Sequence, residues 1–317
     1  MSQESLLYIT ALILACWTVI IVVWERLSPY RKGLHLFREG FWVDLVWYTI
    51  IQSFLLKIVI FDFIIMPLQS RFDWSGVVHI GRWPLVLQVM FFVITHDLYI
   101  YLFHRFQHSN KYFWRIHEAH HSGKEVDFLA GSRSHALEII INQTIEFAPI
   151  ILLGASPEVI PIKALIDSMY GMFIHANIDI KMGKWKYVFN SPELHLWHHA
   201  NYKEVFHANF STKLSLWDYL FGTVYFPGKK PGDKPGNWGL YYKYPKDYFL
   251  QHAFSVKRFD ESALLKFRWF RAYYFLRPRI LQWLGLNKAT AFHTQEREAP
   301  EEDKEMNVLI PDMTDHE

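Results

Sequence analysis

The sequence has only one cysteine among its 317 residues, Cys16, and it lies within an apolar run. A single thiol can form neither an intramolecular disulfide nor a cysteine-based zinc site or iron–sulfur cluster, so any metal must be bound by nitrogen and oxygen ligands. The net charge is only +2, and there is no long basic stretch that could follow a nucleic-acid backbone. The dinucleotide-binding pattern G-x-G-x-x-G is also missing. These absences argue against nucleic-acid partners and against a built-in nicotinamide or iron–sulfur redox group.

Apolar residues, in contrast, are abundant: 51% of the chain is hydrophobic and 18% is aromatic, which exceeds ordinary soluble usage. Residues 6–24 carry no charge and approach the roughly 20 residues that a helix needs to cross a bilayer. Residues 41–66 and 83–103 are two further apolar runs, and two weaker runs, 139–153 and 159–178, flank a Gly- and Pro-containing turn. We therefore expect a mainly helical, integral-membrane bundle of three spans plus a helical hairpin, which carries a histidine-rich helical cap.

The charges of the loops predict the orientation of this bundle. Residues 25–40 contain four basic side chains, whereas residues 67–81 contain only Arg71. Because basic loops tend to stay in the cytosol, the N-terminus is expected outside and the cap in the cytosol, at a bacterial inner membrane or the endoplasmic reticulum. The N-terminal run lacks both a positive leading region and a small-residue cleavage site, so it is expected to remain as an anchor.

Three groups of histidines are the strongest chemical signal in the chain. On a helix, residues three and four apart share a face, so each group directs its imidazoles toward one point. Neutral imidazole binds iron, zinc and copper, and eight such ligands exceed what one ion accepts, so two metal ions are implied. A single histidine is often structural, but three similar clusters would be costly cationic patches without a metal. The groups are His104 and His108; His117, His120 and His121; and His195, His198 and His199.

The order H-x3-H, H-x2-H-H, H-x2-H-H resembles the fatty acid hydroxylase and sterol desaturase superfamily of membrane di-iron enzymes. The resemblance covers residues 97–223 and includes the flanking patterns Asp97-x3-Tyr101-x2-His104-Arg105, Arg133-x-His135-x2-Glu138 and W-D-Y-L-F-G-T at 217–223. It implies that the eight motif histidines bind two iron ions and that His175 is a ninth ligand. The chain departs from the family at Asp179, where some members carry a further histidine, and at His207, where relatives often carry an aspartate.

Five further residues are candidates to orient or supplement the ligands: Asp97, His135, Glu138, Asp179 and His207. Asp97 shares a helical stripe with His104 and could fix the tautomer of an imidazole, although it could instead be a helix-end residue at the membrane surface. Glu138 could support His135 or a motif histidine. Asp179 could bind metal, orient a ligand or do neither, and an isolated histidine such as His207 is usually structural.

The resemblance implies an O2-dependent oxidoreductase that hydroxylates or desaturates a lipid, with electrons from a separate donor protein or reductase. Since the chemistry would be metal-based, no catalytic side chain is assigned. It also implies a division into membrane anchor helices (1–95), a di-iron catalytic domain (96–225), a continuation of the cytosolic cap (226–295) and a disordered acidic tail (296–317).

Two other interpretations remain open at this point. The segment His117-Glu118-x-x-His121 fits the zincin pattern H-E-x-x-H, in which Glu118 would be the general base of an intramembrane zinc metalloprotease. That interpretation leaves the other two histidine groups without a role. The chain could also be a catalytically inactive membrane scaffold that retains the motifs.

Overall fold

The computed structural model describes residues 2–72 and 74–259, all of which belong to the compact unit Met1–Glu261. Within these residues the regular secondary structure is helical, and no β-strand is formed. The predicted mainly helical fold class is therefore confirmed. The predicted acidic tail and the last part of the predicted cap, from residue 260 on, lie outside the described residues.

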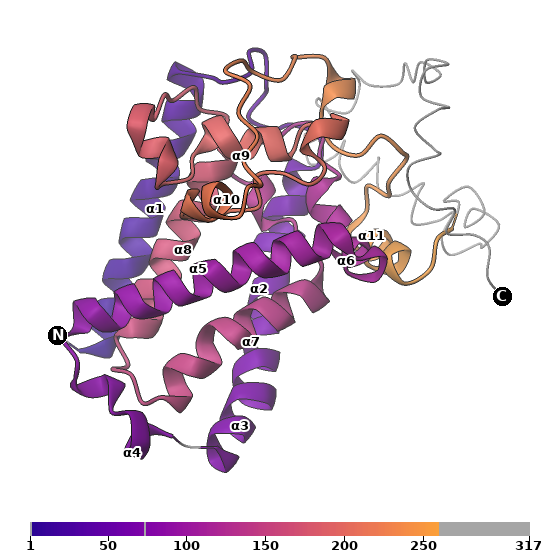
Figure 1. The fold of residues 1–317 in the computed structure, drawn as a ribbon. Coiled ribbons are helices and arrows are strands. Elements are labelled where there is room, and N and C mark those ends of the chain that lie inside the picture. Colours follow the sequence, from indigo (N-terminus) through magenta and orange to yellow (C-terminus); the bar gives the residue numbers. More distant parts are fainter. Residues whose placement is uncertain (1, 73, 260–317) are drawn as a thin grey trace. The chain divides into compact units, whose positions relative to one another are not determined.

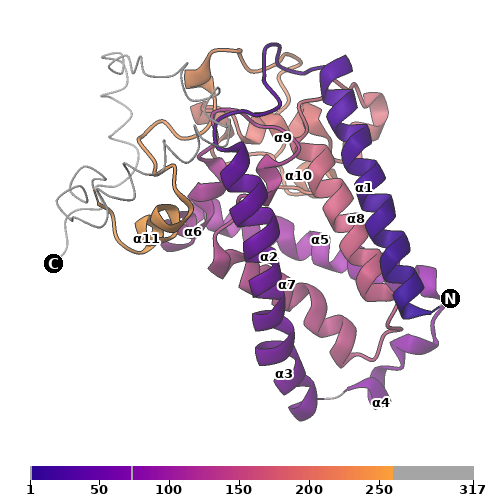
Figure 2. The same cartoon turned by 180° about the vertical axis from the view of Figure 1, so that it is seen from behind.

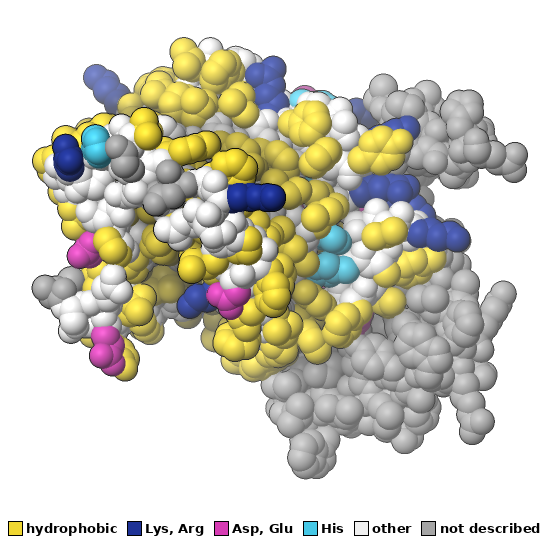
Figure 3. All heavy atoms as spheres, turned by 90° about the horizontal axis from the view of Figure 1, so that it is seen from below, with side chains coloured by type: hydrophobic (Ala, Val, Ile, Leu, Met, Phe, Trp, Pro, Cys, Tyr) yellow, Lys and Arg dark blue, Asp and Glu magenta, His cyan; other side chains and the backbone are white. Residues whose placement is uncertain are grey.

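Three helical stretches are long and apolar enough to cross a membrane, and they match the three predicted spans. The first is α1 (Gln3–Leu27), the second covers Val43–Arg71 and the third is α5 (Leu85–Ser109), with mean hydropathies of 2.7, 2.0 and 1.7. The second stretch alternates between π- and α-helix, in the order η1 (Val43–Gln52), α2 (Ser53–Ile58), η2 (Val59–Ile65) and α3 (Met66–Arg71). Figure 3 shows hydrophobic side chains over most of the described part of one face, as expected for surface in contact with lipid.

The predicted hairpin is also present, as α7 (Ala136–Leu152) and α8 (Val159–His175). Its turn uses Gly154 with a φ of +65°, a conformation that glycine adopts at little steric cost. Figures 1 and 2 show α8 running along α1, and the indole of Trp17 donates a 3.0 Å hydrogen bond to the Met169 carbonyl. The hairpin thus packs against the first span, and it ends at His175.

Short helices form the cap around the ends of α5 and α8. Asn110 caps α6 (Lys111–His121), since its side chain accepts hydrogen bonds from the amides of Tyr112 and Phe113. Pro192 begins α9 (Pro192–His198), where its missing N–H costs nothing. The remaining α-helices are α4 (Ser75–Val78), α10 (Leu216–Leu220) and α11 (Tyr248–Val256), and the 3-10 turns are η3 (Ile80–Arg82), η4 (Ala130–Ser132), η5 (Gly183–Tyr187), η6 (Lys203–Val205) and η7 (Pro235–Asn237).

Candidate metal centre

The structure brings all nine predicted metal ligands together in two adjoining groups. In each group, one side-chain nitrogen of every histidine lies within 4.8 Å of those of the others. The groups touch: the rings of His121 and His199 are stacked with centroids 4.8 Å apart. The first group comprises His104, His108, His117, His121 and His198, and the second comprises His120, His175, His195 and His199.

A single segment of backbone, residues 206–210, orients three ligands of the first group. The Nδ1 atoms of His108, His198 and His104 donate to the carbonyls of residues 206, 208 and 210, at 3.0, 2.8 and 2.8 Å. The segment is irregular, with Phe206 in the right-handed helical region and Asn209 at a φ of +57°, and this backbone turns all three carbonyls toward the histidines. Donation from Nδ1 leaves Nε2 as the atom that is free to bind metal.

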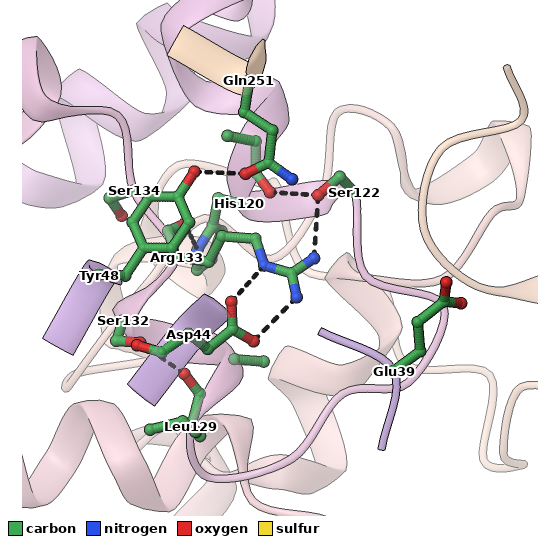
Figure 4. A network of polar contacts seen from close by, with 12 residues as sticks. Glu39, Asp44, Tyr48, His120, Ser122, Leu129, Ser132, Arg133, Ser134 and Gln251 are labelled. Carbon is green, nitrogen blue, oxygen red and sulfur yellow. Dashed lines mark hydrogen bonds and ion pairs between the residues drawn. The ribbon is translucent and has the colours of Figure 1, made fainter. Parts of the chain in front are cut away.

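Three other ligands are held in the same manner by separate acceptors. Glu138 accepts a 2.8 Å hydrogen bond from Nδ1 of His117 and a 2.9 Å bond from the amide of Gln107. Nδ1 of His120 donates to the Arg133 carbonyl at 3.2 Å (Figure 4). Nδ1 of His175 donates to the Gly171 carbonyl, one turn earlier in α8, at 2.7 Å. Glu138 therefore contacts a motif histidine, which is one of the two positions predicted for it.

The inward-facing nitrogens make these groups suitable for binding metal. The Nε2 atoms of His104, His108 and His198 are buried and have no hydrogen-bond partner, which is rare for buried polar atoms. In the second group, Nε2 of His175 lies 3.1 Å from that of His120 and 3.0 Å from that of His195. Nitrogens that converge without acceptors between them are suited to share a metal ion.

The histidines of α6 and α9 also have the protonation state that a metal requires. Burial, followed by the charges of neighbouring histidines, lowers the pKa of the imidazoles of His117 and His121 on α6, of His195 on α9 and of His199 directly after α9, well below the ordinary value. They are therefore neutral near pH 7, and the neutral imidazole is the metal-binding form. The residues present fit a pair of metal ions.

The other predicted residues lie outside both groups, as far as the described part of the chain extends. His135 caps α7 by accepting from the amide of Leu137, and its Nε2 lies 2.9 Å from the Ser255 hydroxyl. Asp179 is ion-paired with Lys230 at 2.7 Å. The side chain of His207 is exposed, although its backbone belongs to the orienting segment.

Asp97 does not orient an imidazole as predicted. Its carboxylate accepts hydrogen bonds from the Thr212 hydroxyl, the Trp217 indole and two backbone amides of the same loop, at 2.7 to 2.9 Å. The reason is geometric: the 212–217 loop folds against this face of α5, and its donors reach the carboxylate first. Asp97 thus affects His104 only indirectly, because it holds the loop that follows residue 210, whose carbonyl orients His104.

Glu118, the general base of the zinc protease interpretation, faces away from the histidines. Its carboxylate forms a bidentate pair with Arg258, at 2.5 and 3.0 Å, and accepts a hydrogen bond from the Tyr242 hydroxyl. It is fully buried in these contacts. A zincin general base must reach the metal-bound water, so this geometry argues against a protease.

A third cluster of potential ligands, His96, Glu146 and Asp167, already contains a cation. The ammonium of Lys163 lies 3.1 Å from Nδ1 of His96, 2.8 Å from the Glu146 carboxylate and 2.6 Å from that of Asp167. The Lys163 nitrogen therefore stands where an ion would be bound, and this cluster is an ion-pair network between α5, α7 and α8.

Sequence reasoning did not find the backbone acceptors. The carbonyls at 206, 208 and 210 leave no residue-type signal, and neither does the Arg133 carbonyl. One trace is Asn209, which adopts a φ of +57°; asparagine is one of the few residues other than glycine that visit this region. Its side chain also bonds Leu194 and Tyr225, and so holds the segment in place.

Comparison with known proteins agrees with this geometry. The fatty acid hydroxylase family model matches residues 89–223, the stretch that contains all nine histidines. This match and the two relatives described below support placing the chain in the fatty acid hydroxylase and sterol desaturase superfamily. The resemblance inferred from the motifs is thereby confirmed.

Two relatives in this superfamily are similar to the chain over part of its length. It is 26% identical to the ornithine lipid hydroxylase OlsE of Rhizobium tropici over 187 residues, which is 57% of this chain and 56% of the relative. It is 27% identical to the alkylglycerol monooxygenase of Caenorhabditis elegans over 116 residues, 35% of this chain and 22% of the relative. The chain thus matches about half or less of the length of these relatives. No solved structure matches it.

Proposed function

We propose that this fatty acid hydroxylase family protein is a membrane monooxygenase that uses two iron ions, O2 and external electrons to hydroxylate a lipid. The observation that carries the proposal is the convergence of nine histidines in two adjoining groups, eight of them buried and His108 half-buried, within a matched hydroxylase domain. The two relatives, named for lipid hydroxylation and for oxygenation of an alkylglycerol, support a lipid substrate. Desaturation of a lipid is the second candidate, since both reactions begin with the removal of hydrogen.

In this proposal the first group of five histidines holds one iron and the second group of four holds the other. Bound iron would supply the redox chemistry with O2 that zinc lacks. The chain's own residues orient the histidine ligands and shield them from water. Glu138 and the carbonyls at 206, 208 and 210 fix the tautomers of four imidazoles, and the ligands lie inside the protein, away from bulk water. No side chain is proposed as a nucleophile or a general base.

The placement of ligands on α5 suits a substrate dissolved in the bilayer. His104 and His108 lie in the last two turns of a helix that is apolar enough to span a membrane, and whose Leu102 and Phe106 are exposed. An acyl chain could approach this surface from the side, so that its reacting carbon reaches the irons without leaving the membrane.

The orientation and the electron supply are further parts of the proposal. The segment after His175 meets the end of α1, because the Asp179 amide donates to the Ser28 carbonyl at 2.8 Å. The basic loop 25–40 follows at once, so the centre is assigned to the cytosolic side. Residues 96–225 form the catalytic domain in this proposal, and a separate reductase or carrier delivers the electrons.

Metal analysis of the purified full-length protein tests the proposal first. We expect two irons per chain, and His120→Ala and His198→Ala should each reduce the content, since they remove one ligand from each group. His35→Ala is the matched control, because this exposed histidine lies in the 25–40 loop. One zinc per chain, with iron absent, would contradict the oxygenase and revive the protease.

Lipid extracts from cells with and without the gene identify the reaction. Hydroxylation adds one oxygen atom to a lipid, whereas desaturation removes two hydrogen atoms, and mass spectrometry separates these outcomes. Unchanged lipid profiles and unchanged iron content in both His→Ala variants would instead support the inactive scaffold.

A further inference from the structure

An exposed patch of aromatic, aliphatic and lysine side chains lies on the cap beside the metal centre. It is formed by η5 with the residues that follow it, and by α10. Its exposed apolar members are Trp185, Tyr187, Phe189, Leu216, Leu220 and Phe221, with exposed fractions from 37% to 65%. So many large apolar side chains in one place are unusual on a water-facing surface, and they mark a surface that binds something.

The two segments form one continuous surface. The Ser215 hydroxyl donates to the Lys186 carbonyl at 2.6 Å, and the Leu216 amide donates to the Val188 carbonyl at 3.4 Å. The rings of Tyr187 and Tyr219 are in contact, with centroids 4.9 Å apart. The patch is therefore a fixed feature of the fold rather than two independent loops.

The exposed charge of the patch is basic. Lys184 is exposed, Lys181 is exposed with its ammonium 3.4 Å from the buried carboxylate of Glu193, and the ammonium of Lys186 lies 3.8 Å from the centre of the Phe226 ring. The acidic side chains of the same segments are buried: Asp218 accepts hydrogen bonds from the amides of residues 210 and 211, and Glu193 accepts one from the amide of residue 182. Lysines that surround exposed tryptophan and leucine are typical of surfaces that insert into the headgroup region of an anionic membrane.

The position of the patch agrees with a membrane partner. The chain reaches Lys181 directly from Asp179, whose amide is bonded to the carbonyl of Ser28 at the end of α1. The patch thus begins where the first candidate span ends, so it continues the apolar surface of that span.

We infer that this patch is an interfacial membrane-binding site, in which the apolar side chains enter the bilayer and Lys181, Lys184 and Lys186 bind the headgroups of anionic phospholipids. The site also adjoins the metal centre: Phe221 stacks on Tyr101 with centroids 5.3 Å apart, and Tyr101 contacts Phe210, whose carbonyl orients His104. Contact with the membrane would therefore set the height of the centre above the acyl chains. The inference holds whatever reaction the centre catalyses.

A spin label tests this inference. In a Cys16→Ser background, nitroxide labels are attached at Leu220→Cys and, as a water-exposed reference, at Asp233→Cys. The wild-type protein, labelled at its native Cys16 on α1, gives the lipid reference. The full-length protein is placed in liposomes with and without anionic phospholipid, and collision rates are measured with O2 and with a water-soluble nickel chelate. We expect the label at 220 to resemble that at 16, and to shift further toward it when anionic lipid is present.

Charge variants separate lysine binding from simple apolar contact. Each lysine near an anionic surface favours the bound state by about fivefold, so Lys184→Glu with Lys186→Glu should abolish the anionic-lipid shift. The matched control, Lys203→Glu with Lys234→Glu, makes the same charge change at exposed cap positions and should keep the shift, as should Lys184→Arg with Lys186→Arg. A label at 220 that stays accessible to nickel in both liposomes overturns the inference. So does a label that is already shielded in lipid-free detergent in a concentration-dependent way, because a second copy of the chain would then cover the patch.

Discussion

Asp44, at the start of the second candidate span, holds Arg133 by two hydrogen bonds: its Oδ1 accepts from Nε at 2.7 Å and its Oδ2 accepts from Nη2 at 2.8 Å (Figure 4). Oδ2 also lies 2.8 Å from Arg38, which pairs with Asp127 as well. All of these side chains are almost fully buried. Because the carbonyl of Arg133 accepts the Nδ1 proton of His120, this network connects a membrane helix to a ligand of the second histidine group.

Replacing Asp44 should therefore affect both stability and metal binding. Asp44→Asn leaves two buried guanidinium groups short of their counter-charge, and breaking such a buried pair costs about 3–5 kcal/mol. We also expect weaker iron binding, since the partners that orient a ligand contribute about 10–100-fold to metal affinity. Thermal unfolding and iron content in detergent measure the two effects. Glu39→Gln is the control: its pair with Lys246, at 2.7 Å, is exposed and should contribute about 0–1 kcal/mol.

Glu138 is the only side-chain carboxylate among the described residues that accepts a hydrogen bond from one of the nine histidines. Glu138→Ala should lower iron affinity by about 10–100-fold, because Nδ1 of His117 loses its acceptor and its tautomer is no longer fixed. Glu138→Gln keeps an oxygen at the same place and should retain most of the iron. Iron titration of the stripped protein measures both. Equal affinities for the two variants would show that the acceptor oxygen of Glu138 does not contribute to iron binding.

Asn209 offers a pair of substitutions that separate backbone strain from hydrogen bonding. Asn209→Gly keeps the left-handed conformation but loses the side-chain hydrogen bonds to Leu194 and Tyr225, a loss of about 1–3 kcal/mol for buried groups. Asn209→Ala loses the same bonds and adds about 1–2 kcal/mol of left-handed strain. We expect the melting temperature and the iron retention to decrease from wild type to Asn209→Gly and again from Asn209→Gly to Asn209→Ala. A more stable Ala variant would contradict the role assigned to the conformation at 209.

Glu118 should influence stability without influencing the metal. Glu118→Gln weakens the pair with Arg258 but leaves the histidine nitrogens in place, so a lower melting temperature with unchanged iron content is expected. Arg258→Gln should have a similar effect, because it removes the other half of the same pair and leaves a buried carboxylate uncompensated. Loss of iron, or of a proteolytic activity, in Glu118→Gln would favour the zincin interpretation after all.

The sequence predicts the spans, the hairpin and the histidine ligands because each of these features depends on residue type and on spacing along the chain. Apolar runs of membrane length and imidazoles three or four residues apart depend on helix geometry alone. Even His175, which has no neighbouring motif histidine, was found from the family pattern. In the structure, Nε2 of His175 lies 3.0 Å from Nε2 of His195. This contact joins two segments of the chain, and spacing alone does not indicate it.

The parts that orient the ligands could not be predicted, since they depend on tertiary contacts between backbone and side chains. Nothing in the composition distinguishes the carbonyl at 208 from any other carbonyl. Asp97 illustrates the opposite error: its helical spacing from His104 is correct, but the 212–217 loop supplies better-placed donors. Spacing along one helix indicates which side chains share a face, whereas the identity of their partners is decided by the segment that packs there.

The Lys163 cluster provides a test of which buried groups bind metal. Lys163→Met removes the ammonium that lies 2.8 Å from Glu146 and 2.6 Å from Asp167; Asp167 keeps Lys213 at 2.9 Å, but Glu146 loses its cation, so a loss of about 3–5 kcal/mol is expected. Lys57→Met is the matched control, because Lys57 also lies in an apolar helical stretch but is exposed. Iron content should stay at the wild-type value in both variants, since the ammonium of Lys163, and not a metal ion, lies between His96 and the two carboxylates. A decrease in bound metal specific to Lys163→Met would mean that this cluster contributes to the centre, and the assignment of all metal binding to the nine histidines would have to be abandoned.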